Sequence, residues 1–167
     1  MKIACLLTLL LASPICFTQT TKIDRTTLKI QTIYDQAGTY LIRQDLKDLV
    51  KYFQETRTQD YVYISSKGVK HPLTDMLRSM AMVFSSYRIV RTSVHIDQLK
   101  SSGSSAMATV TTRIEMVPKM AGHRTTHTVG QEVHGIDTWT RVGDNWKLKL
   151  SKVSSESVLQ DGKRLHD

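Results

Sequence analysis

Near its carboxyl-terminal end the chain reads Gly135-Ile136-Asp137-Thr138-Trp139-Thr140-Arg141-Val142-Gly143-Asp144-Asn145-Trp146-Lys147-Leu148-Lys149-Leu150. This segment predicts a tight β-hairpin with one tryptophan on each strand, and it holds both tryptophans of the protein. Val142-Gly143-Asp144-Asn145 supplies the turn, because Gly, Asp and Asn accept positive φ or bond to the local backbone. Apolar and basic residues alternate from Trp146 to Leu150, which is the period of a half-buried strand.

The chain between this hairpin and Tyr87 predicts more strands. Val94 and Ile96 alternate with polar neighbours, and apolar residues share one face between Ala106 and Met116. Turns are expected at 101–105 and 118–122, a long strand from about 123 to 141, and a last strand from 146 toward 158. These segments predict a meander of long antiparallel strands.

The first part of the chain has helical spacing instead. Three amphipathic helices are expected, the third with Pro72 in its first turn. A short strand, 60–64, lies between the second and third helices, and a turn at 65–68 closes it. The apolar faces of the helices are formed by Ile33, Ala37, Tyr40 and Leu41, by Leu46, Leu49, Val50 and Phe53, and by Leu73, Leu77, Met80 and Phe84.

Helices first and strands afterwards predict an α+β fold with the helices on one face of the sheet. With its Asp60-Tyr61-Val62-Tyr63-Ile64…Gly68 segment and its Asp137-Thr138-Trp139…Gly143…Trp146-Lys147-Leu148 hairpin, the chain resembles the nuclear-transport-factor-two-like superfamily, and within it the exported SnoaL-like type. The resemblance covers about residues 25–160. It implies a cone in which three N-terminal helices pack on a strongly curved antiparallel sheet around a pocket. Isomerases, cyclases, dehydratases and non-catalytic modules share this fold, so the resemblance implies a fold rather than an activity.

The first residues have the pattern of an export signal. Lys2 precedes an apolar run from Ile3 to Leu11 that is too short to span a bilayer. We expect a signal peptide at 1–19, one domain at 20–167, and an exported protein, periplasmic or secreted. Cys5 and Cys16 both lie in the signal, so the mature chain is expected to be free of cysteine, disulfides and thiol chemistry.

The composition and motifs argue against several classes of function. The formal net charge is +8, but the basic residues are scattered rather than clustered, which disfavours nucleic-acid binding. The sequence has no glycine-rich phosphate loop, dinucleotide fingerprint or nucleophile elbow, so no cofactor is expected. No metal site is expected either, because His123 and His127 lie on a predicted strand, where four residues span roughly 13 Å.

Asp137 is the most informative candidate for catalysis. On a regular strand it shares a largely apolar face with Gln131, Val133 and Trp139, so it would lie on the wall of the core or pocket. Burial there raises the pKa of a carboxyl group, which suits a general base. Two other interpretations remain open: Asp137 bonds to the backbone or Arg141, or a bulge at Gly135 turns it outward.

The other candidates are ligand-binding residues. They are Tyr34, Asp60, Tyr63, Gln131 and Trp139. A tyrosine at the mouth of a cone can donate to an oxyanion, the part that it plays in the isomerases that this chain resembles. Amphipathic packing explains the tyrosines and Trp139 equally well.

Two hypotheses follow for the function. In the first, an exported cone binds a small, mainly apolar molecule or a protein partner, without catalysis. In the second, the protein is a cofactor-independent isomerase, dehydratase or cyclase with Asp137 as its base and a tyrosine as oxyanion donor. A homodimer through the open face of the sheet is a further expectation, by likeness to related cones.

Overall fold

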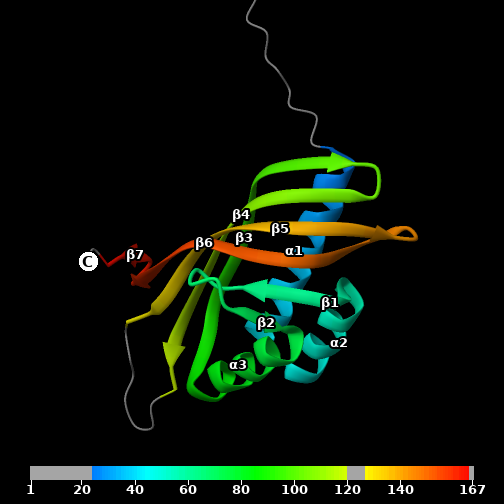
Figure 1. Cartoon of the computed structure of the whole chain (residues 1–167). Coiled ribbons are helices and arrows are strands. Elements are labelled where there is room, and N and C mark those ends of the chain that lie inside the picture. The colour runs from blue at the N-terminus through cyan, green and yellow to red at the C-terminus, as the bar shows by residue number, and fades with distance from the viewer. Residues whose placement is uncertain (1–23, 120–126, 166–167) are drawn as a thin grey trace, which may run out of the picture.

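The computed structural model describes residues 24–119 and 127–165. Three helices pack on one face of a curved sheet that does not close (Figure 1). The elements in chain order are α1 (Arg25–Arg43), α2 (Leu46–Thr56), β1 (Arg57–Ile64), β2 (Lys70–Pro72), α3 (Leu73–Ser86), β3 (Tyr87–Ser102), β4 (Ser105–Pro118), β5 (Val129–Val142), β6 (Asn145–Gln160) and β7 (Lys163–Arg164). The expected signal peptide lies outside the described residues.

The helices begin and end at residues suited to these positions. Gln44 caps α1 in the left-handed conformation, with φ 54°, and its N–H donates to the carbonyl of Leu41. The side chain of Asp45 caps α2 by accepting from the N–H of Asp48 at 3.1 Å. Pro72 is the N-cap of α3 and also the last residue of the short strand β2. The sequence did not predict this strand.

The sheet has the order β2-β1-β6-β5-β4-β3, with β7 added to β6. The α+β cone is confirmed, but the sheet is mixed rather than wholly antiparallel, because β1 and β6 run parallel. The physical reason is the connection between them. Because α3 and the three strands β3, β4 and β5 come between β1 and β6, β6 can lie beside β1 in the parallel direction without a tight turn.

The core lies between the helices and the inner face of the sheet, in two clusters. One surrounds Trp139, Trp146 and Ile30 and is formed by α1, β1 and the β4–β6 strands. The other surrounds Leu49, Phe53 and Phe84 from α2, α3 and neighbouring segments. Together they fix α1 across the sheet, and α1 contacts β3 most extensively.

The predicted hairpin is present as β5 and β6. Gly143 takes φ 60° at the first position of a two-residue loop, as a tight hairpin turn requires. Strand β5 is regular against β4, whereas β6 carries one extra residue at Lys149 and another at Ser154. The extra residue at Lys149 changes which residues of β6 face inward. Trp146 and Leu148 face inward before it, and Ser151 and Val153 face inward after it.

No helix in the described part of the chain is both long enough and apolar enough to cross a membrane.

Candidate functional site

A cavity of about 450 Å³ lies between the helices and the inner face of the sheet. Its walls come from α1, α2, α3 and from strands β1 to β6. Most of the lining is apolar, and includes Leu41, Phe53, Met76, Val110 and Leu148. Polar side chains interrupt this apolar surface, and their positions determine how a bound molecule would be oriented.

Asp137 lies on the cavity wall, where it is 6% exposed. The hydroxyl of Tyr34 donates to its Oδ2 at 2.5 Å. Burial raises the pKa of Asp137, while hydrogen bonds from Tyr34 and Ser151 and the charge of Arg57 act in the opposite direction. Burial therefore gives the carboxyl group a higher proton affinity than that of an exposed aspartate, as a general base or a neutral donor requires.

Neither alternative placement of Asp137 occurs in the structure. The register of β5 against β4 is unbroken through Gly135, and the irregularity beside it is an extra residue in β6. Arg141 instead donates to the carbonyl of Gly143 and to Asp144, each at 3.1 Å. Asp137 consequently faces the cavity, and its described side-chain partners are Tyr34 and Ser151.

Tyr34 projects from the middle of α1 toward β5. Its ring meets that of Trp139 edge-on, with centroids 5.3 Å apart and an angle of 88°. Burial first, and then the neighbouring Asp137, raise the pKa of Tyr34 above its ordinary range. The phenol therefore keeps its proton and orients the carboxyl group of Asp137 by donating to it.

The structure adds Arg57 and Ser151 to the cavity, two residues that the sequence analysis did not select. Arg57 is the C-cap of α2 and the first residue of β1. Its guanidinium carbon lies 3.4 Å from the centroid of the Phe53 ring. Burial lowers the pKa of Arg57, and the nearby Tyr61 and Asp137 oppose that shift.

The remaining predicted ligand-binding residues divide into two groups. Tyr63 and Gln131 line the cavity. Trp139 is 1% exposed and does not line the cavity, but its ring packs against that of Tyr34. Asp60 lies on the outer surface, where its carboxylate is 3.7 Å from Nζ of Lys149, so it is not part of this site.

The histidines do not form a metal site in the described residues, which contain no cluster of three or more potential ligands. Nδ1 of His127 lies 2.8 Å from Asp161. Nε2 of His95 lies 4.0 Å from Asp97, on an exposed surface. His123, the other member of the pair considered from sequence, lies outside the described residues.

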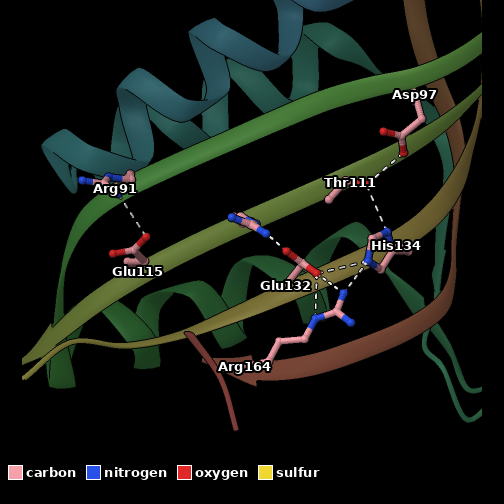
Figure 2. A network of polar contacts seen from close by, with 8 residues as sticks. Arg91, Asp97, Thr111, Glu115, Glu132, His134 and Arg164 are labelled. Atoms are coloured by element: carbon pink, nitrogen blue, oxygen red, sulfur yellow. Dashed lines mark hydrogen bonds and ion pairs between the residues drawn. The ribbon is translucent and has the colours of Figure 1, made fainter. Parts of the chain in front are cut away.

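A second polar cluster, centred on Glu132, lies on the other face of the sheet (Figure 2). Glu132 is 2% exposed and accepts from Arg113, from Arg164 on β7 and from His134. The hydrogen bonds from Arg164 contribute most to lowering the pKa of Glu132, to about 2. This ion-pair network is satisfied within the protein and faces away from the cavity, so we assign it a structural role.

Comparison with solved structures identifies the fold. The chain is similar to a conserved protein from Planctomyces limnophilus, with a TM-score of 0.64 and 14% identity over 76% of this chain and 93% of that one. A nuclear-transport-factor-two-like protein from Cytophaga hutchinsonii matches with a TM-score of 0.54 and 11% identity over 80% and 99%. A putative scytalone dehydratase from Novosphingobium aromaticivorans matches with a TM-score of 0.51 and 13% identity over 84% and 89%.

No protein-family model matches the sequence, and no curated protein does. The structural likenesses confirm the nuclear-transport-factor-two-like fold that the sequence predicted. At these identities they show the fold alone. What the protein does has to be argued from the cavity.

Proposed function

We propose that this protein binds a small, mainly apolar molecule inside its cone. The observation that carries the proposal is the cavity of about 450 Å³, with apolar walls and a few convergent polar groups. Ligand sites of small-molecule binders have this size and composition. The interior volume favours a small molecule over the alternative of a protein partner, which would need an extended outer surface.

The polar end of the cavity explains how such a molecule would be oriented. Asp137 and Tyr34 form one hydrogen-bonded unit, and Ser151 and Arg57 lie close enough to influence the pKa of Asp137. A ligand with one polar group would place that group here and its apolar part against Val110 and the helices. This arrangement gives a single preferred orientation.

Two matched threonines on β4 provide the test. Thr112 lines the cavity, whereas Thr109 is exposed on the other face of the same strand. We expect octanol, measured by titration calorimetry, to bind wild type and Thr109→Phe equally. Thr112→Phe should weaken binding by about tenfold or more, because the ring occupies ligand volume. Equal affinity in Thr112→Phe, with the fold intact by circular dichroism, would place the ligand elsewhere.

Acid–base catalysis is the second candidate function, and the buried Asp137 with its raised pKa favours it. In this version Asp137 removes a proton from a carbon beside a carbonyl group, while Tyr34 holds the carboxyl group in place. The fold is shared with the putative scytalone dehydratase, and this likeness is consistent with the second candidate function.

Isotope exchange tests the catalytic version without a known substrate. In heavy water the wild type should incorporate deuterium beside the carbonyl of cyclic ketones faster than Asp137→Asn does, as read by NMR. Asp137→Asn keeps the size of the side chain and removes the base. Equal exchange rates in the two proteins would remove Asp137 as the base for this reaction class and leave the binding function standing.

Export as a SnoaL-like protein and dimerisation through the sheet complete the proposal. Both are supported by sequence resemblance, the first by the apolar run at 3–11. The mass of the protein recovered from an expressing cell tests the cleavage of residues 1–19. Sedimentation at high concentration tests the dimer, which a purely monomeric profile would exclude.

A further inference from the structure

Arg57 places a positive charge inside a mostly apolar cavity. Its guanidinium lies against the face of Phe53, at 3.4 Å from the centroid, and 5.4 Å from the centroid of the Tyr61 ring. Both aromatic rings also line the cavity. The planar group is therefore held by cation–π contacts, and these use the face of the guanidinium rather than its N–H groups.

The hydrogen-bonding capacity of this guanidinium is not fully used. Nη1 donates to Thr56 Oγ1 at 3.3 Å and the guanidinium also interacts with the side chain of Tyr61, while the buried Nε has no hydrogen-bond partner among the described residues. Within residues 24–119 and 127–165, Arg57 forms no ion pair with a carboxylate. A buried donor without a partner is costly, and a buried charge without a counterion more so.

The carboxyl group whose charge acts on Arg57 inside the cavity is a poor counterion. Asp137 interacts with Arg57 through its charge, but the oxygen Oδ2 of Asp137 already accepts from Tyr34. Burial favours the neutral form of Asp137, since it raises the pKa of this carboxyl group. Asp137 and Arg57 form no salt bridge among the described residues, so the position of a direct counterion to Arg57 is open to a ligand.

We propose that the ligand of this cavity carries a carboxylate and that the guanidinium of Arg57 binds it. The inference rests on the proposed function, because it names the chemical class of the molecule bound there. A guanidinium fork matches the two oxygens of a carboxylate. A single buried cation neutralises one negative charge, which favours a monocarboxylate over a doubly charged phosphate. Lys152, the other strong base in the lining, is exposed and lies nearer to solvent.

The position of Arg57 in α2 does not by itself explain this geometry. A cation at the C-terminal end of a helix is favourable, and Arg57 has that position. An exposed side chain would provide the same interaction with the helix dipole while its donors stayed hydrated. Arg57 instead lines the cavity, and its buried Nε has no acceptor among the described residues.

The experiment compares octanoate with octanol, two probes that differ in the polar group alone, by titration calorimetry at neutral pH. We expect wild type to bind octanoate about tenfold or more tightly than octanol, because hydrogen bonds to a charged group are the stronger ones. Arg57→Met keeps the length and the packing on Phe53, and should lose this preference while it still binds octanol. The control Arg88→Gln removes an exposed positive charge from β3 and should keep the preference.

The outcomes separate the inference from the proposed function. Equal affinity of wild type for the two probes, or an unchanged preference in Arg57→Met, overturns the carboxylate inference and leaves apolar binding standing. Failure of both probes to bind overturns the proposed function and the inference with it. Should Arg57→Met not fold, Arg57→Lys keeps a charge without the planar fork. It should reduce the preference for octanoate by about threefold or more, and an unchanged preference there refutes the role of the guanidinium.

Discussion

Removal of the Tyr34 hydroxyl is the sharpest test of the polar end of the cavity. Tyr34→Phe keeps the ring against Trp139 and deletes the donor that bonds to Asp137 at 2.5 Å. Asp137 is 6% exposed, so water has little access to replace that donor. A hydrogen bond to a charged group contributes about 1.5 to 3 kcal/mol, which is the loss of unfolding free energy that we expect when Asp137 is ionised.

The loss should depend on pH in a direction that the structure determines. Asp137 has a higher pKa in the folded than in the unfolded protein, so its contribution to stability is complete below the unfolded value, about 3.9, and is lost as pH rises through the folded value. The Tyr34 hydrogen bond opposes that rise in pKa, and its removal enlarges the loss at higher pH. With Asp137 neutral, the bond contributes only about 0.5 to 1.5 kcal/mol.

Urea unfolding at about pH 8 and about pH 4 measures both values. The expected difference between Tyr34→Phe and wild type is about 1 kcal/mol or more larger at the higher pH. Tyr40→Phe on the same helix is the matched control, since the Tyr40 ring packs on Tyr52 and its hydroxyl has no hydrogen bond among the described residues. A loss that is equal at both pH values, or as small as that of Tyr40→Phe, would refute a charged Asp137 bonded to Tyr34.

Two further substitutions test the sheet. Glu132→Gln should lower the unfolding free energy by about 1 to 2 kcal/mol near neutral pH, because charged hydrogen bonds are lost and their arginine partners are half exposed. The folded pKa of Glu132 is lowered, so its contribution is present above about 4.5 and is lost as pH falls through about 2; urea unfolding of the two proteins should converge over that range. Gly130→Ala should destabilise by about 3 kcal/mol, since its Cβ would lie 2.4 Å from the carbonyl oxygen of Ile114. Gly103 has open space around it and only a positive φ, so Gly103→Ala should lose about 1 kcal/mol of unfolding free energy, as measured by thermal unfolding. Equal losses in the two alanine variants would contradict the close approach of the Ile114 carbonyl to Gly130.

The elements that could be predicted from sequence are those in which one hydrophobic period continues without interruption. The helices and strand β5 are of this kind, and the inward direction of Asp137 follows from the regular register of β5 against β4. The parallel pairing of β1 with β6 could not be predicted, since periodicity describes the faces of a strand and not its neighbour or direction.

The sequence did not identify two residues of the cavity, Ser151 and Arg57, because they lie where the hydrophobic period of a strand is interrupted. Ser151 faces inward only because the extra residue at Lys149 changes the inward-facing positions of β6. Arg57 begins β1, three residues before the strand start expected at Asp60, and the pairing of β1 with β6 is irregular between Arg57 and Val62. Arg57 does share alternate positions with Tyr61, which lines the same cavity, so a strand extended toward α2 would have identified it.

The position of β6 in the sheet has a consequence for how the chain folds. It lies between β1 and β5, although 80 residues, 65–144, separate the end of β1 from its start. During synthesis, β1 with β2 and the β3–β5 meander can each form early, but their facing edges stay unpaired until β6 has left the ribosome. Contacts of such long sequence separation slow folding, and open strand edges invite pairing with other chains. Strand β6 thus completes the cavity and ends the period in which the nascent protein is most prone to aggregate.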